Sequence, residues 1–156
     1  MHTSRRSTVA ILLLLAIVGA VGCSSQTKAW RLHWTATDRI NPSETGAPGS
    51  VKVWVYQLKN KEKFQHATCQ TLSATPPNAF GSDSLGNQFF MAFPGKEGME
   101  PLEVNKEAAY FAIMAEFEQC QTGSWKQLVE AKSSLMNPLT PTIRLVIDRN
   151  TIKLAD

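Results

Sequence analysis

The sequence lacks the short motifs that carry most enzyme chemistry. It contains no G-x-S-x-G elbow, no glycine-rich phosphate loop and no H-E-x-x-H motif. Histidine is scarce as well, and neither His33 nor His66 has a cysteine or carboxylate at the spacing that metal ligands need. These absences predict a protein that is not an enzyme and that holds neither a metal nor a cofactor.

Two weaker catalytic arrangements have simpler explanations. Glu116 and Glu118 would share one face of a strand, as paired glycosidase carboxylates do, but a solvated sheet face is far commoner. Cys69 follows His66 by three residues, which permits a thiol nucleophile on a helix, but a disulfide explains this cysteine with fewer assumptions. An enzyme is therefore only the third hypothesis for this chain.

A second long apolar run is also absent. The single run, residues 9–21, is shorter than the ~20 residues that cross a bilayer as a helix. Arg5 and Arg6 precede it, and it ends in small residues up to Gly22, which is the order of an export signal. Cys23 then stands where the lipobox of bacterial lipoproteins has its modified cysteine. We predict cleavage before Cys23, which would carry a diacylglycerol thioether and a further acyl chain.

An ordinary secretory signal that happens to end near a cysteine is the alternative, and Ala20 favours it, because the lipobox more often has leucine there. Two or three acyl chains hold a protein on a membrane, whereas one binds only marginally. Ser24, rather than aspartate, is typical of sorting to the outer membrane. The predicted organisation is a signal at 1–22, the lipidated cysteine and a tether at 23–28, and one domain at 29–156 with a helical insertion at about 59–86.

No large excess of either charge remains without the signal. Loss of Arg5 and Arg6 lowers the basic count from 16 to 14 against 13 acidic residues, a formal charge of +1. Lysines and acids are scattered, and no basic stripe is interleaved with aromatic residues, so the sequence argues against a nucleic-acid partner. The remaining 134 of the 156 residues are enough for one domain with its own core.

Cysteine is rare, and only Cys69 and Cys120 remain for pairing if Cys23 carries lipid. In the oxidising periplasm such a pair most simply forms a disulfide. Two separate buried thiols are the alternative.

Alternation of apolar and polar residues dominates the rest of the chain. Residues 30–34 alternate large apolar residues with Arg31 and His33, and residues 51–55 place three valines on one face. A short helix follows, with Asn60 as its expected N-cap. Further strands are expected at 89–93, 102–104, 110–117 and 125–131, and 142–147 with 151–154 form a closing hairpin. About eight strands with one helical excursion predict a mainly β fold, a two-sheet antiparallel sandwich.

The aromatic residues allow two interpretations. Trp30, Trp34, Trp54 and Trp125 are expected to fill the core between the sheets. The alternative is a stripe of exposed tryptophans, and it would make the chain an outer-membrane lipoprotein that binds a glycan or peptidoglycan fragment.

Several features, each weak alone, follow one another in a fixed order behind the lipobox. They are Asn41-Pro42 with Gly46-Ala47-Pro48, the strand VKVWVYQLKN, the series Phe64, Ala67 and Leu72, the turn Phe93-Pro94-Gly95, the segment AAYFAIMAEFEQ and Trp125. In this order they resemble the TssJ family, also called VasD or SciN, the outer-membrane lipoprotein of bacterial type VI secretion.

The resemblance implies a transthyretin-like sandwich with a small helical insertion and a protruding loop between the first two strands. It also implies an anchor in the outer membrane, facing the periplasm, and binding to the periplasmic domain of the inner-membrane protein TssM, which completes a trans-envelope complex with TssL. By position the loop is residues 38–50, on which Ile40 is expected to present an apolar contact. The residues expected to bind the partner are Arg39, Ile40, Asn41, Pro42, Ser43, Glu44 and Thr45.

Overall fold

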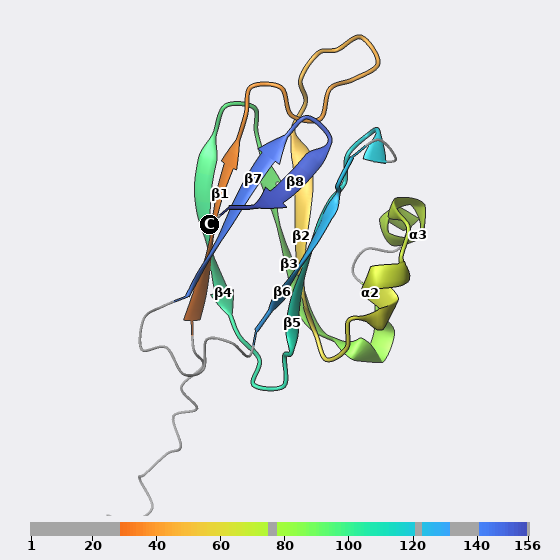
Figure 1. Ribbon diagram of the computed structural model, residues 1–156, viewed down its shortest axis with the longest axis vertical. Coiled ribbons are helices and arrows are strands. Elements are labelled where there is room, and N and C mark those ends of the chain that lie inside the picture. The colour runs from red at the N-terminus through yellow and green to blue at the C-terminus, as the bar shows by residue number, and fades with distance from the viewer. Residues whose placement is uncertain (1–28, 75–77, 121–122, 132–140, 156) are drawn as a thin grey trace, which may run out of the picture.

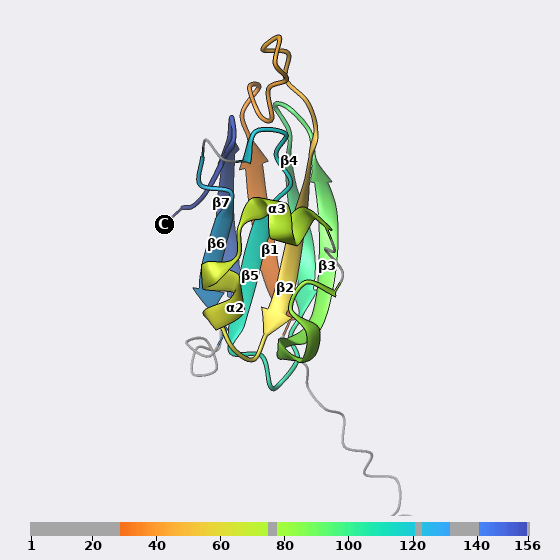
Figure 2. The same ribbon diagram turned by 90° about the vertical axis from the view of Figure 1, so that its right-hand side faces the viewer.

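The computed structural model describes residues 29–74, 78–120, 123–131 and 141–155. The predicted signal, Cys23 and the tether lie outside the described residues. Among the described residues, no helix is long and apolar enough to cross a membrane. The described chain forms a β-sandwich with a small helical layer against one of its sheets (Figures 1 and 2).

Two four-stranded sheets make up the sandwich, which confirms the predicted fold class. In spatial order, the first sheet contains β4 (Glu97–Glu103), β1 (Ala29–Ala36), β7 (Thr142–Asp148) and β8 (Thr151–Leu154), and the second contains β3 (Ser84–Ala92), β2 (Val51–Leu58), β5 (Tyr110–Ala115) and β6 (Lys126–Glu130). All neighbours pair antiparallel except β1 and β7, which are parallel. Alternation along a strand indicates which face is buried but not which strand lies beside it, so the parallel pair was not predicted.

The core between the sheets is built from alternate residues of both. Trp30 of β1 packs on Phe111 of the facing sheet, with ring centroids 5.1 Å apart, and Trp34 stacks on Phe90 at 5.3 Å. Gly98 is the register partner of Trp34, and a Cβ atom there would come within 2.6 Å of the indole. Gly98 on β4 therefore leaves the space that the Trp34 indole occupies.

A second, smaller core lies on the outer face of the sheet that contains β2. Trp54, Tyr56 and Leu58 point to this face, and Phe64 and Phe80 of the connection to β3 cover them. Tyr56 meets Phe80 edge-on at 4.8 Å. The expectation that all four tryptophans lie between the sheets is therefore wrong for Trp54, which faces the helical layer.

The connection between β2 and β3 contains α2 (Glu62–His66), α3 (Cys69–Ala74) and a 3-10 turn, η2 (Gly81–Asp83), which cover the second sheet (Figure 2). The single helix expected from Asn60 is in fact divided. Ala67 is extended, and a second helix begins after Thr68. The Thr68 hydroxyl accepts from the Thr71 N–H (3.3 Å), as an N-cap side chain does, and the Thr68 N–H donates to the Thr71 hydroxyl (3.1 Å). Asn60 is not the cap of α2, and its side chain reaches Asp83 instead.

Two contacts hold this helical layer on the sandwich. The ammonium group of Lys126, on β6, donates to the backbone carbonyls of Phe64 (2.9 Å), Gln65 (2.7 Å) and Ala67 (2.9 Å), at the end of α2 where a cation is favourable. A disulfide joins Cys69 to Cys120, as predicted, across a sequence separation of 51 residues. Closing a loop of this length stabilises the folded chain by roughly 4 kcal/mol in the chain-entropy description.

The second core predicts a specific loss of stability in alkaline solution. Burial raises the pKa of the Tyr56 hydroxyl far above its ordinary value, and the charge of Glu116 raises it further. The neutral hydroxyl is thus favoured in the folded state, so its contribution is complete below about pH 10, the pKa in an unfolded chain, and is lost as the pH rises beyond it. We expect the unfolding free energy to fall there by up to about 1.4 kcal/mol per pH unit from this group.

Urea unfolding at several pH values measures this slope. The Tyr56→Phe variant should show a shallower alkaline slope than the wild type. Equal slopes for the two proteins would contradict the assignment to Tyr56.

Candidate docking surface

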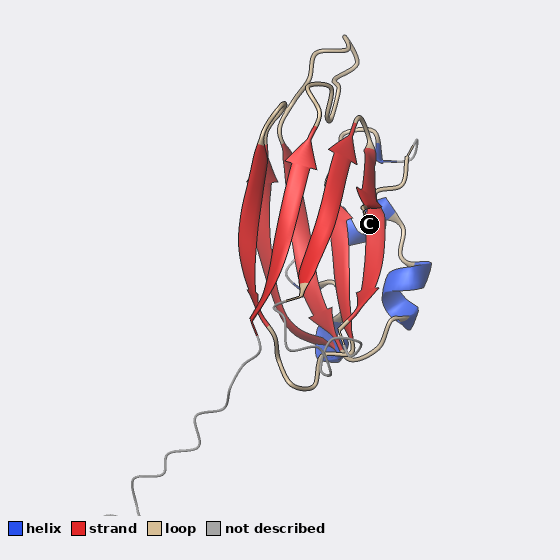
Figure 3. Ribbon diagram, turned by 60° about the vertical axis from the view of Figure 1, so that its left-hand side comes forward, coloured by secondary structure: helices blue, strands red, loops and turns tan. Residues whose placement is uncertain are grey.

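The connection between β1 and β2, residues 37–50, projects beyond the ends of the strands. We call it the β1–β2 loop. It lies at the end of the sandwich opposite Ala29, where the described chain begins (Figures 1 and 3). Hydrogen bonds tie its base to the sandwich, and its tip is exposed.

Asn41 joins three parts of the structure at the base of the loop. Its side-chain N–H donates to the Ser50 carbonyl (2.7 Å), which closes the loop, and its side-chain oxygen accepts from the Glu118 N–H (2.8 Å), beyond β5. Its backbone N–H donates to the Arg149 carbonyl (2.9 Å) in the β7–β8 turn. Asn41 has a φ of 45°, in the left-handed region that asparagine tolerates better than most residues. One buried residue thus links the loop to both sheets.

Ile40 lies in the core, which corrects a prediction. Its exposed fraction is 0%, and it packs with the apolar residues between the two sheets. The expectation that Ile40 presents an apolar contact to a partner is therefore wrong. The physical reason is that the loop first folds over the open end of the sandwich, where an apolar side chain removes core surface from water.

The tip of the loop is a compact turn. The Ser43 N–H donates to the Ala47 carbonyl (2.9 Å), and the Gly46 N–H donates back to the Ser43 carbonyl (2.9 Å). Gly46 has a φ of 83°, which glycine adopts without steric cost. These bonds define the shape of the tip before any partner binds, so little conformational entropy is lost on binding.

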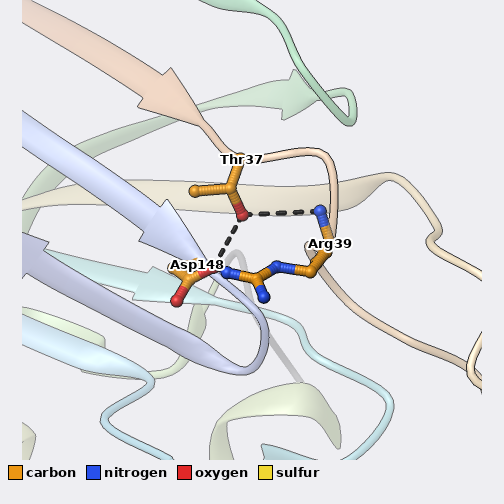
Figure 4. A network of polar contacts seen from close by, with 3 residues as sticks. All are labelled: Thr37, Arg39 and Asp148. Carbon is orange, nitrogen blue, oxygen red and sulfur yellow. Dashed lines mark hydrogen bonds and ion pairs between the residues drawn. The ribbon is translucent and has the colours of Figure 1, made fainter.

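A polar network joins the loop to the end of β7 (Figure 4). The Thr37 hydroxyl donates to Asp148 Oδ1 (2.7 Å) and accepts from the Arg39 N–H (3.4 Å), and Arg39 Nη2 lies 3.9 Å from the same carboxylate oxygen. Both charged side chains are well exposed, so the ion pair contributes at most about 1 kcal/mol. The network orients the Arg39 side chain more than it stabilises the fold.

The predicted partner-binding residues therefore fall into three groups. The side chains of Arg39, Glu44 and Thr45 are exposed, those of Pro42 and Ser43 are half-buried, and those of Ile40 and Asn41 are buried. Residues 46–48 are also exposed and complete the tip. The turn residues indicated the loop, but nothing in its sequence distinguished its base from its tip.

The tryptophans offer no exposed aromatic stripe. Trp30, Trp34 and Trp54 are at most 7% exposed, and Trp125 is half-buried between the two cores. The exposed stripe behind the glycan-binding alternative is therefore not found among the four tryptophans.

The carboxylates and histidines considered as catalytic or metal-binding residues do not form a common site among the described residues. Glu116 accepts a hydrogen bond from the Trp54 indole (2.8 Å), whereas Glu118 is exposed at the base of the loop. His33 lies 3.8 Å from Glu97 at the sheet surface. Within the described residues, no group of three or more histidine, cysteine, aspartate or glutamate side chains is placed to hold a metal ion.

Fold and loop together define a β-sandwich domain whose distinctive surface is a preformed loop at one end. A profile of the family described as type VI secretion lipoprotein, VasD, EvfM, TssJ, VC_A0113, matches residues 28–150. The chain belongs to this family of type VI secretion lipoproteins, which is not known as an enzyme family. A comparison with curated protein sequences found no match.

Solved structures share the fold. Serratia marcescens Lip, described as a membrane bound component of the type VI secretion system, is 17% identical with a TM-score of 0.75, over 83% of this chain and 97% of that one. The lipoprotein TssJ1 from Pseudomonas aeruginosa is 19% identical with a TM-score of 0.67, over 83% and 95%. A chain in a structure described as the TssM C-terminal domain (869–1107) from EAEC is 25% identical with a TM-score of 0.69, over 83% and 98%.

The central position of Asn41 predicts that its side chain controls the order of the loop. Asn41→Gly keeps the left-handed backbone accessible but removes both side-chain hydrogen bonds, which should lower the unfolding free energy by about 1–3 kcal/mol. Hydrogen exchange should accelerate at the Gly49 and Glu118 amides. Asn41→Asp retains the acceptor for Glu118 but not the donor to Ser50, so it should free the loop and leave the Glu118 amide protected. Unchanged exchange at both amides in Asn41→Gly would contradict this role.

Proposed function

We propose that this chain is an outer-membrane lipoprotein that docks the periplasmic domain of a TssM-like inner-membrane protein in a type VI secretion system. Lipid on Cys23 is its anchor, and the β1–β2 loop is its main contact. A TssL-like protein joins the same complex through TssM. The proposed activity is assembly, with no chemical step.

The observation that carries this proposal is the placement of the loop. Residues 37–50 project from the end of the sandwich opposite Ala29, and Ala29 lies only a few residues after Cys23 (Figure 1). An anchor at Cys23 therefore leaves the loop free to point away from the membrane surface. Its hydrogen-bonded tip and buried base are suited to binding without prior reorganisation.

The comparisons support the same partner. The family is described as a type VI secretion lipoprotein, and one of the structures with a similar fold is described as a TssM C-terminal domain.

The first test concerns the loop tip. Replacing residues 44–48 with glycine and serine, while keeping Ile40 and Asn41, should weaken binding to the periplasmic domain of the same organism's TssM-like protein by about tenfold or more. Calorimetry measures the affinity, and near-UV circular dichroism of the tryptophans checks the fold. Lys106→Gly, an exposed change between β4 and β5 at the other end of the sandwich, is the control. Normal binding by a folded tip variant would place the contact elsewhere.

The second test concerns the anchor. Cys23→Ser removes the thiol that accepts lipid, so the protein should leave the outer-membrane fraction and secretion should fail, while the domain still folds and binds its partner. Membrane fractionation and a secretion assay measure the two effects. Outer-membrane retention of the serine variant would show that lipid on Cys23 is not the anchor.

A further inference from the structure

The outer face of the first sheet gathers positive charge between its middle, where Arg144 lies beside His33, and the end that carries the loop. Four exposed cations make up this patch, which we call the basic face: Arg144 on β7, Lys153 on β8, Arg149 in the turn between them and Arg39 at the base of the β1–β2 loop. Asp148 is the one acidic side chain among them. The patch carries a formal charge of +3, whereas the whole chain from Cys23 onward carries +1.

Strand register brings these cations together. Val146 pairs with Lys153, so Arg144, two residues before Val146, is a diagonal neighbour of Lys153 on the same face. Diagonal neighbours on a sheet lie roughly 7–8 Å apart, within the Debye length of about 8 Å at physiological salt. The two cations repel each other, and an acidic partner would relieve this repulsion.

Two acidic side chains on this side of the sandwich approach other groups, whereas Asp38 and Glu118, exposed near the base of the loop, take part in none of the ion pairs between described residues. Glu97 lies on β4, at the far edge of the sheet, where it approaches His33. Asp148 approaches Arg39. Among the ion pairs between described residues, none includes Arg144, Arg149 or Lys153. These three cations are therefore available to an external anion.

A depression of about 340 Å³ lies within the basic face, between the base of the loop and the β7–β8 hairpin. Besides Arg39, Asp148, Arg149 and Lys153 it is lined by Val146, Thr37 and Thr151, and the Thr37 hydroxyl donates to Asp148. Arg149 has a φ of 49°, because it is one of the two central residues of the tight β7–β8 hairpin turn. Guanidinium and ammonium donors around a small depression fit a carboxylate side chain.

We propose that the basic face binds an acidic surface of the protein that docks at the β1–β2 loop, with one carboxylate seated in the depression. This inference rests on the proposed docking function, and it further specifies that the docking partner presents an acidic surface. A protein partner is favoured because Arg39 belongs to both the loop and the depression, so the two surfaces are continuous. The helical layer lies against the other sheet and not against this face (Figures 1 and 2).

The test compares two charge reversals, each of a lysine to glutamate, in the full-length lipidated chain held in neutral detergent micelles. Lys153→Glu should lower the association rate with the TssM-like periplasmic domain about tenfold at low salt, and the difference should shrink as salt is added. Lys106→Glu, at the other end of the sandwich, should change the rate less than about twofold. Arg144→Glu added to Lys153→Glu should lower the rate again.

The outcomes separate this inference from the docking proposal. One outcome is that the loop-tip variant binds weakly while Lys153→Glu and Lys106→Glu associate at the same rate. In that case the docking proposal is supported and the proposed acidic contact is wrong. If the wild type does not bind the TssM-like domain, the docking proposal fails, and the basic face is then tested by itself with poly-L-glutamate as a model acidic polypeptide. Chemical-shift changes of β7 and β8 amides that disappear in Lys153→Glu would support an acidic protein partner.

No shifts with poly-L-glutamate would overturn the inference. Shifts only with micelles that contain phosphatidylglycerol would also overturn it, because the basic face would then meet a membrane.

Discussion

Strand β2 lies inside its sheet, and both of its faces are buried. Val51, Val53 and Val55 point into the space between the sheets, whereas Trp54 and Tyr56 point outward. A strand that is apolar on both faces needs cover on both, and the connection to β3 supplies the second layer. The disulfide and Lys126 hold that layer in place. The other sheet carries no such layer among the described elements, so its outer face is left for polar and charged side chains.

This division of faces separates the groups that stabilise the fold from the surfaces proposed for docking. The helical layer and both cores occupy one side and the interior, whereas the β1–β2 loop and the basic face belong to the side that no described helix covers. Asn41 ties the two regions together, because it bonds to the loop, to the segment after β5 and to the β7–β8 turn. A partner that contacts the loop therefore meets a surface that the core holds rigid, and this lowers the entropic cost of docking.

Local features of the sequence predicted much of this molecule. Alternation predicted the strands, the last two strands formed the expected hairpin, and the cysteine pair was confirmed. Features that depend on which strands become neighbours were not predictable. Ile40 looked like an exposed contact because its neighbours are polar, yet it closes the core. The basic face was hidden for the same reason, since Arg39 is more than a hundred positions from Arg144 and Lys153.

The parallel pairing of β1 with β7 has a consequence for the order of folding. The first strand of the domain finds one of its two neighbours, β4, midway along the chain and the other, β7, almost at the end. Contacts of such high sequence separation form late, because a long loop must close before they contribute. The larger core therefore cannot be completed until the C-terminal hairpin has joined the sheet. Full burial of the tryptophan-bearing first strand depends on the last strands of the chain.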